Sequence, residues 1–276
     1  MKIAYVDFWG GFDPIEFWIT RLLRSKYEVE ISDPFNSDLI IGSCFGNSIR
    51  LFEKSKAIKI LFLGENVRPS YNFYDYSLSF DYSDNNNRNI RLPLWTLYVD
   101  WWGNKSEDLS LDELNYIFSP EDIYNRQNFA CIVAGNPVKN RMEIYNKLNL
   151  YKKVDGYGFA FKNRYDGRKH DLLKNYRYNI CFENSIYPGY CTEKLLQAKV
   201  AGCVPIYYGC KESENDFNEK CYLNLINYSM EEFIEKIIKI DDNKDEFIQI
   251  ASEPLFSKKP DLNFLYDFFD KILNSH

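Results

Sequence analysis

Short apolar runs alternate with stretches of helical spacing along most of the chain. The spacing of apolar residues predicts helices at residues 15–23, 140–148, 193–201, 229–238 and 262–273. Short runs typical of strands lie at residues 2–7, 27–31, 39–42, 59–63, 76–81, 129–134, 154–157, 178–182 and 204–208. Strands that alternate with helices in this way predict an α/β protein with parallel sheets.

A polar and weakly periodic segment at residues 83–127, which includes the run NNNRN at 85–89, separates two such blocks. The blocks predict two Rossmann-like domains, at residues 1–125 and 126–260, with a terminal helix over 261–276. Neither block contains GxGxxG or GxxxxGK[ST], so a dinucleotide site or a Walker-type ATP site is not expected.

Composition excludes several classes of protein. The hydrophobic content of 45% is too high for a disordered chain. The net charge of -6 and the pI of about 5.2 argue against a nucleic-acid partner. The aromatic content of 17% has two explanations that composition does not separate: rings that stack on sugars, or the codon usage of an AT-rich genome.

Cysteine and histidine usage bears on compartment and chemistry. The seven cysteines are odd in number, form no CxxC and fall partly in apolar runs, which favours buried free thiols in a reducing compartment. With only two histidines, a histidine zinc site or a Ser-His-Asp triad is not expected. No signal peptide or run of 18 apolar residues is present, so we expect a cytoplasmic protein with at most peripheral association with the inner membrane face.

The segment FENSIYPGYCTEKLLQAKVAGCVPIYYG, at residues 182–209, is the richest in candidate chemistry. A buried strand ends at Phe182, and Thr192 has the place of a helix N-cap. Ligands of open α/β sheets bind at the carboxyl ends of strands, and the helix N-terminus with a lysine suits a phosphate. The alternative is that the first-turn glutamate satisfies the helix dipole and the lysine is solvated. The polar candidates in this segment are Glu183, Asn184, Tyr190, Glu193 and Lys194.

Three further segments place polar or aromatic residues after a strand. In CIVAGNPVKNR, Lys139 and Arg141 near a helix start are candidates for binding a pyrophosphate, although Asn-Pro is also an ordinary turn. In LFLGENVRPS, a partly desolvated Glu65 is a candidate general base, or it caps a turn. In FWGGFDPIEFW, Trp9 is either a platform for an acceptor sugar or a core aromatic.

Together these segments resemble glycosyltransferase family 10, the α-1,3/4-fucosyltransferases, in a bacterial or viral form. The family pattern FENS…YxTEKxxxAxxAGxVPxxxG is present with all its anchors, and Cys191 stands where the family usually has Ile or Val. GENVRPSYNFYDYSLSFD resembles the acceptor-side motif of the family, and AGNPVKNR resembles its third motif. The three motifs occur in the order that the family has.

The resemblance implies the GT-B architecture, with the two Rossmann-like domains facing a cleft, the first binding the acceptor and the second the nucleotide sugar. It implies an inverting transfer of L-fucose from GDP-β-L-fucose to O3 of GlcNAc in an N-acetyllactosamine-like chain, as part of an oligosaccharide or lipopolysaccharide-type acceptor. A GT-B enzyme with another nucleotide deoxysugar and a non-catalytic glycan-binding relative remain alternatives.

The resemblance also assigns roles to single residues. Glu65 matches the catalytic base, and Arg141, with Lys139 as its rival, matches the pyrophosphate ligand. Because no Asp-x-Asp stands at a strand end, we expect no metal ligands and no required cofactor, and leave stimulation by Mn²⁺ open. The other donor contacts are expected from Glu183, Asn184, Tyr190, Glu193 and Lys194, and the acceptor contacts from Trp9, Gly10 and Asn66.

Overall fold

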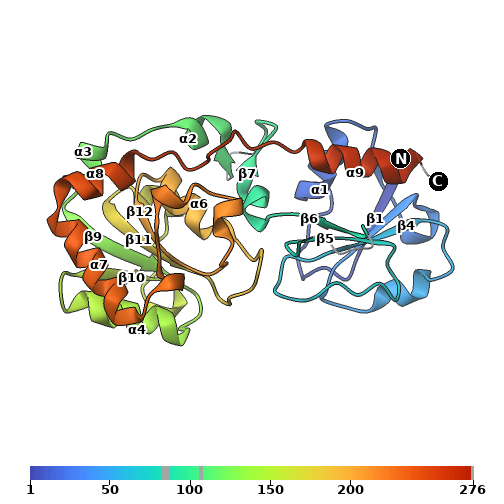
Figure 1. The fold of residues 1–276 in the computed structure, drawn as a ribbon. Coiled ribbons are helices and arrows are strands. Elements are labelled where there is room, and N and C mark those ends of the chain that lie inside the picture. The colour runs from blue at the N-terminus through green and yellow to red at the C-terminus, as the bar shows by residue number, and fades with distance from the viewer. Residues whose placement is uncertain (83–86, 106–107, 275–276) are drawn as a thin grey trace. The chain divides into compact units, whose positions relative to one another are not determined.

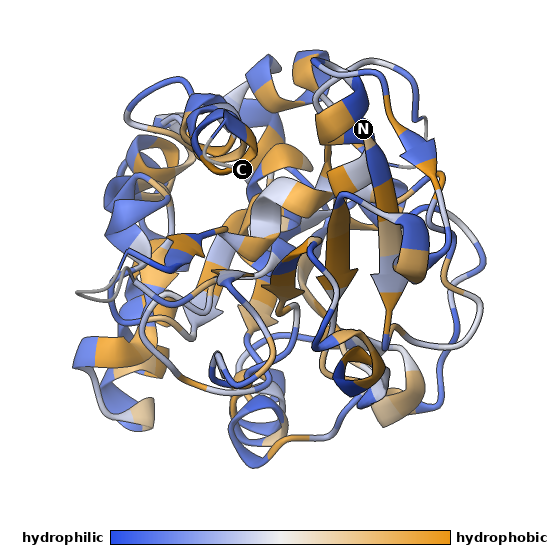
Figure 2. Cartoon of the chain, turned by 90° about the vertical axis from the view of Figure 1, so that its right-hand side faces the viewer, coloured by the Kyte–Doolittle hydropathy of each residue, from blue (hydrophilic) through white to orange (hydrophobic). Residues whose placement is uncertain are grey.

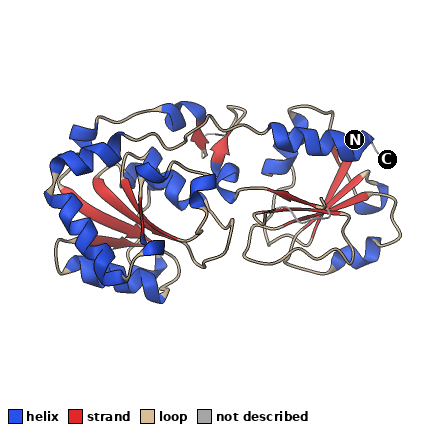
Figure 3. Cartoon of the chain, in the orientation of Figure 1, coloured by secondary structure: helices blue, strands red, loops and turns tan. Residues whose placement is uncertain are grey.

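The computed structural model describes residues 1–82, 87–105 and 108–274. It divides into two compact units, Met1–Asp108 with Asp261–His276, and Leu109–Pro260. Each unit has a parallel sheet with helices packed around it (Figures 1 and 3). Residues 83–86 and 106–107 of the predicted polar segment, two of them in the NNNRN run, and residues 275–276 of the predicted terminal helix lie outside the described residues.

Six parallel strands form the sheet in the described part of the first unit, in the order β2-β1-β3-β4-β5-β6. All residues of β3 and β4 are buried, as expected for parallel strands covered on both faces. The strands are β1 (Lys2–Val6), β2 (Glu30–Ile31), β3 (Leu39–Gly42), β4 (Ile58–Phe62), β5 (Tyr76–Ser79) and β6 (Asn89–Arg91).

Strand β6 lies in the segment that the pattern predicts to be irregular. Its buried residue is polar rather than apolar: the Asn89 amide accepts hydrogen bonds from the hydroxyls of Ser77 and Ser79, both at 2.7 Å. The same amide donates to the backbone carbonyl of Asp81 at 2.7 Å. A strand held by such a polar network has no apolar run by which the sequence could show it.

Helix α9 (Asn263–Asn274) packs in the first unit beside α1 (Trp18–Arg24), although the whole second unit separates them in sequence (Figure 1). Leu265 and Phe269 of α9 are fully buried in the same core as Leu22 of α1. The predicted terminal helix is therefore confirmed, but it is part of the first unit rather than a separate one.

The boundary between the units lies at 108/109, not at the predicted 125/126. A buried arginine of α1 explains the earlier boundary. Arg21 bonds the carboxylates of Asp100 at 2.6 Å and Asp108 at 3.3 Å, and so ties this segment to the first unit. From β8 (Leu109–Ser110) onwards the chain belongs to the second unit, whose core buries Ile123. The elements at the boundary are β7 (Val99–Asp100), β8, α2 (Leu111–Asn115) and α3 (Pro120–Tyr124).

Five parallel strands form the sheet in the described second unit, in the order β10-β9-β11-β12-β13. Predicted and observed strands coincide closely, while β13, the short α5 and α8 were not predicted. The strands are β9 (Asn128–Val133), β10 (Val154–Tyr157), β11 (Tyr176–Phe182), β12 (Val204–Tyr208) and β13 (Leu223–Asn224). The helices are α4 (Lys139–Asn149), α5 (Lys169–Leu173), α6 (Glu193–Val200), α7 (Met230–Asp242) and α8 (Lys244–Ser252).

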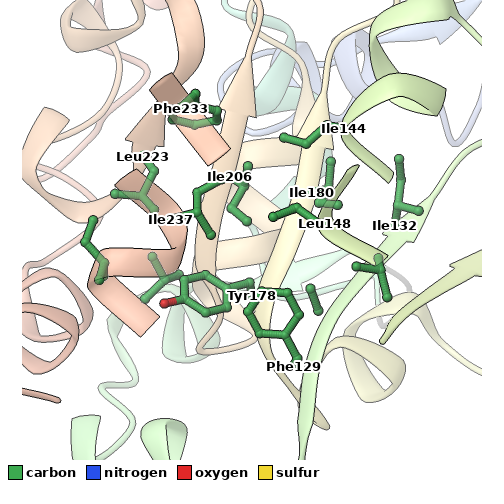
Figure 4. Packing of buried hydrophobic residues seen from close by; sticks show 14 of the residues in the cluster. Phe129, Ile132, Ile144, Leu148, Tyr178, Ile180, Ile206, Leu223, Phe233 and Ile237 are labelled. Atoms are coloured by element: carbon green, nitrogen blue, oxygen red, sulfur yellow. The ribbon is translucent and has the colours of Figure 1, made fainter. Parts of the chain in front are cut away.

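Hydrophobic residues concentrate on the central strands, while the helices carry both hydrophobic and hydrophilic residues (Figure 2). In the second unit, isoleucines of β9, β11 and β12 pack against α4 and α7, and the rings of Phe129 and Tyr178 lie together (Figure 4). This rigid core fixes the carboxyl ends of the strands, from which the polar candidates project. Among the described residues, no helix is both long enough and apolar enough to cross a bilayer.

Candidate functional site

A buried carboxylate marks the carboxyl end of β11. Glu183 follows this strand, and its side chain is 0% exposed. It accepts hydrogen bonds from the Thr192 backbone N–H at 2.8 Å, from the Thr192 hydroxyl at 2.7 and 2.9 Å, and from Lys194 Nζ at 2.9 Å. Gly209, just after β12, leaves room for it, because a Cβ there would lie 2.4 Å from Glu183 Cγ.

Lys194 is the cation of this cluster. Its ammonium contacts the Thr192 hydroxyl at 2.7 Å and a Glu193 carboxylate oxygen at 3.6 Å, and the side chain is 16% exposed. Burial opposes the charge, but the carboxylates of Glu183 and Glu193 outweigh it and raise the pKa of Lys194. The ammonium therefore stays charged at neutral pH at a place that a ligand can reach, which argues against a merely solvated lysine.

The N-terminus of α6 is open. Thr192 stands at the N-cap as predicted, but its hydroxyl makes no capping bond and binds Glu183 and Lys194 instead. The first backbone N–H groups of α6 thus have no side-chain cap, an arrangement that suits an anion. Burial raises the pKa of Glu193, but Lys194 and Lys169 outweigh it and hold that pKa below its usual range.

Arg141 is buried behind the same strand end. Its Nε and Nη2 both donate to the Phe182 carbonyl, at 3.1 and 2.5 Å, and Nη1 donates to the Asn136 carbonyl at 3.3 Å. Burial lowers the pKa of Arg141, and Glu183 and Glu193 act against this shift. A guanidinium has five N–H donors, so two remain beyond these three bonds. Arg141 therefore keeps two N–H donors that these bonds do not use.

The other predicted donor residues differ in exposure. Lys139, the first residue of α4, is exposed and has no ion-pair or hydrogen-bond partner in the described chain, and Asn184 is also exposed. Tyr190 is buried, and it lies near enough to Arg141 and Lys194 to influence the pKa of both. The structure thus brings Tyr190 and Arg141 together with Lys194, and it leaves Lys139 and Asn184 on the surface.

Sequence reasoning missed a pocket of about 400 Å³ beside this cluster, lined by Tyr157, Phe159, Tyr165 and Lys169 among others. Lys169, the first residue of α5, donates to the Gln197 side chain of α6 at 2.8 Å. Burial lowers the pKa of Lys169, and Glu193 opposes this shift. The segment GRKH, at residues 167–170, gives only a weak sequence signal for this side of the pocket. The contact between Lys169 and Gln197 joins residues 28 positions apart, so local spacing does not reveal it.

In the first unit, the ends of β1, β3 and β4 bring a second group together. Glu65 follows β4. Burial is the main cause that raises the pKa of the Cys44 thiol, and the charge of Glu65 adds to it, so the two side chains are near each other. Glu65 is exposed and has no ion-pair or hydrogen-bond partner of its carboxylate within the described residues. The structure thus shows Glu65 as an exposed side chain and not as a partly desolvated one.

Exposed aromatic rings lie at the same edge of this sheet. Trp9, after β1, is 43% exposed, and its ring meets that of Phe45, after β3, at 5.9 Å. Phe45 is 51% exposed and was missed, since a lone phenylalanine carries no sequence signal. Gly10 is exposed with open space around it, whereas Asn66 is half-buried and accepts a hydrogen bond from Arg68.

The described residues contain no group of three or more His, Cys, Asp and Glu side chains that could hold a metal ion. Independence from metal ions stays a prediction.

Two family models match most of the chain. The Alpha-(1,3)-fucosyltransferase FucT N-terminal domain matches residues 3–98, and Glycosyltransferase family 10 (fucosyltransferase) C-term matches residues 123–251. Alpha-(1,3)-fucosyltransferase FucT of Helicobacter pylori is 28% identical over 92% of this chain and 60% of its own length. Fucosyltransferase 9 of Bos taurus, a 4-galactosyl-N-acetylglucosaminide 3-alpha-L-fucosyltransferase, is 28% identical over 46% of this chain and 37% of its own. The chain thus spans 60% or less of the length of these relatives.

Solved structures agree with this match. A crystal structure of an alpha1,3-fucosyltransferase superposes with a TM-score of 0.82 and 26% identity, over 99% of this chain and 90% of that one. A crystal structure of an alpha1,3-fucosyltransferase with GDP-fucose superposes with a TM-score of 0.78 and 27% identity, again over 99% of this chain and 90% of that one. Anabaena HepE in complex with UDP-glucose superposes with a TM-score of 0.53 and 10% identity, which shows a similar fold and no more. The predicted α/β fold of GT-B type is confirmed, while the cleft between the domains stays a prediction. The chain belongs to glycosyltransferase family 10.

Proposed function

We propose that this chain is an inverting α-1,3-fucosyltransferase that moves L-fucose from GDP-β-L-fucose to a hydroxyl of an acceptor glycan. The observation that carries the proposal is the Glu183–Thr192–Lys194 cluster at the open N-terminus of α6. It keeps one charged ammonium within reach of a ligand, at the strand ends where nucleotides bind in such sheets. The likeness to a fucosyltransferase solved with GDP-fucose supports this donor.

The donor side supplies positive charge for the leaving diphosphate. As the bond from the anomeric carbon to the phosphate oxygen breaks, negative charge grows on GDP. The Lys194 ammonium, the two remaining N–H groups of Arg141 and the first amides of α6 stabilise that charge. Exposed Lys139, the first residue of α4, adds a further cation. The ionised Glu193 accepts from a hydroxyl of the ribose or of the fucose.

The pocket beside the cluster suits the base of the nucleotide. Its aromatic wall of Tyr157, Phe159 and Tyr165 offers faces on which a planar purine stacks. Lys169 lies between this pocket and Glu193, so a nucleotide whose base lies in the pocket extends its phosphates towards α6.

The acceptor side supplies the base. The acceptor hydroxyl attacks the anomeric carbon from the face opposite GDP, through a transition state that resembles an oxocarbenium ion. Glu65 takes the hydroxyl proton as the new bond forms, so the β-linked donor gives an α-linked product. An exposed carboxylate without a bonding partner in the described chain is free for this role.

The aromatic edge of the first unit is proposed to bind the acceptor, O3 of GlcNAc in an N-acetyllactosamine-like chain of an oligosaccharide or lipopolysaccharide. Changing Trp9 or Phe45 to Ala is expected to raise the acceptor KM about tenfold, because ring–sugar stacking is lost, and to leave the KM for GDP-fucose unchanged. Phe35→Ala, which removes another exposed ring before β3, is the matched control and should change neither KM. Equal effects on both substrates would exclude an acceptor platform.

We also propose that no metal ion is required, because Lys194, Arg141 and the α6 amides supply the positive charge. EDTA is expected to leave the rate of transfer within about twofold of its initial value, with at most a modest stimulation by Mn²⁺. Loss of turnover in EDTA that Mg²⁺ or Mn²⁺ restores would contradict this proposal.

The proposal is tested by a transfer assay on a glycan array with GDP-fucose and a panel of other sugar nucleotides. We expect transfer from GDP-fucose to glycans with a terminal N-acetyllactosamine unit. Transfer from another deoxysugar nucleotide alone would identify a different GT-B enzyme. Glycan binding without transfer or donor hydrolysis would identify a non-catalytic relative.

A further inference from the structure

Two buried cysteines lie directly behind the donor cluster. Cys191 precedes Thr192, and Cys210 follows Gly209 at the end of β12, and both are 0% exposed. Both follow Glu183 in the sequence, Cys191 just before α6 and Cys210 just after β12. The loop at residues 184–188 that leads towards Cys191 has exposed positions.

The two sulfur atoms share one hydrogen-bond network. The Gly189 backbone N–H donates to Cys210 Sγ at 3.1 Å. The Tyr207 hydroxyl lies 3.4 Å from Cys191 Sγ and accepts from the Cys210 backbone N–H at 3.0 Å. The Cys210 thiol also donates to a Glu212 carboxylate oxygen at 3.6 Å. The Tyr207 hydroxyl thus links the Cys191 sulfur to the Cys210 backbone and places the two cysteines beside each other.

The network makes the two thiols chemically unlike. Hydrogen bonds from the Cys191 thiol and from backbone N–H groups lower the pKa of Cys210. The bond to Cys210, and then burial, raise the pKa of Cys191. Burial also raises the pKa of the other cysteines, which are Cys44, Cys131, Cys181, Cys203 and Cys221. The reactive thiolate thus forms at Cys210, beside a thiol that resolves it.

We propose that Cys191 and Cys210 form a reversible disulfide site that turns the donor pocket off when a peroxide oxidises it. The Cys210 thiolate attacks the O–O bond of hydrogen peroxide, becomes a sulfenic acid, and the hydroxide that leaves takes a proton to give water. The Cys191 sulfur then displaces the hydroxyl of the sulfenic acid, which leaves as a second water with the Cys191 proton. Two thiols are oxidised to one disulfide, and one peroxide is reduced to two waters.

The effect on the donor rests on the proposed function. A disulfide bond of about 2.05 Å is much shorter than a contact between hydrogen-bonded thiols, so its formation pulls Cys191 towards β12. The next residue, Thr192, moves with it. Because the Thr192 N–H and hydroxyl hold Glu183 and Lys194, the cluster that binds the diphosphate loses its geometry.

Peptide mapping under non-reducing conditions tests the site. Tryptic peptides 178–194 and 200–211 contain two cysteines each, so a chymotryptic digest that cuts after Phe182 and Tyr208 is needed to separate them. After treatment with hydrogen peroxide we expect one linked peptide pair, Cys191 to Cys210. The affinity for GDP, measured by isothermal titration, should fall about tenfold and return with dithiothreitol.

Two variants serve as controls. Cys191→Val, the residue type usual in the family, should bind GDP like the reduced protein and lose the response to peroxide. Cys221→Ala, at another buried cysteine, should keep that response. No linked pair, or a linked pair with unchanged GDP affinity, would overturn the proposal. If peroxide links Cys191 to Cys210 but the reduced protein does not bind GDP, the donor assignment is refuted and only the disulfide site stands.

Discussion

Replacing Glu65 by Gln is expected to lower the rate of fucosyl transfer by about 10²–10⁴-fold, the usual contribution of a general base. The amide keeps the shape of the side chain but cannot take the hydroxyl proton. GDP affinity should not change, because the residues proposed for the donor lie in the second unit and Glu65 in the first. Steady-state kinetics and isothermal titration of the same preparation measure the two quantities.

The control for this prediction is Glu53→Gln, which changes another exposed carboxylate of the first unit, in the segment that leads into β4. It should retain full activity. Turnover of Glu65→Gln within a few-fold of the wild type would remove Glu65 from the role of base and leave it as a surface residue after a turn.

Lys194→Met is expected to weaken GDP binding by about 10- to 100-fold, since a hydrogen bond to a charged group contributes about 1.5–3 kcal/mol. The same change removes the cation beside buried Glu183 and should lower the free energy of unfolding by up to about 3–5 kcal/mol. Without the ammonium, the pKa of Glu183 in the folded protein should rise further. A raised folded pKa means that stability is present at low pH and is lost as the pH rises, so the defect should be smallest in acid.

A double variant separates the two roles of Lys194. Glu183→Gln with Lys194→Met removes both charges and keeps an amide that still accepts from Thr192. We expect it to regain most of the stability in chemical denaturation and none of the GDP affinity. If Lys194→Met binds GDP like the wild type, the lysine serves only as the partner of Glu183.

The strands and the donor segment could be predicted because their signals are local. The apolar runs of β3 and β12 give their bounds directly, and the polar residues that follow β11 lie at its carboxyl end as expected. Thr192 also begins α6 as predicted. Its hydroxyl binds Glu183 rather than the helix, which only a contact across the sheet decides.

The remaining features depend on partners that are distant in sequence. The boundary at 108/109 follows from Arg21 and its two aspartates, about 80 residues apart. Helix α9 returns to the first core from the far end of the chain. Lys169 becomes part of the candidate donor region, and Phe45 part of the candidate acceptor region, through packing and not through any motif.

The configuration of the product tests the central claim most directly. The protein is incubated with GDP-β-L-fucose and N-acetyllactosamine, and the purified product is analysed by proton NMR for the anomeric coupling and the linkage position. The account predicts an α-linked fucose on O3 of GlcNAc, formed by the wild type and almost absent with Glu65→Gln. A β-linked product, or no fucosylated product from an acceptor that binds, would contradict it.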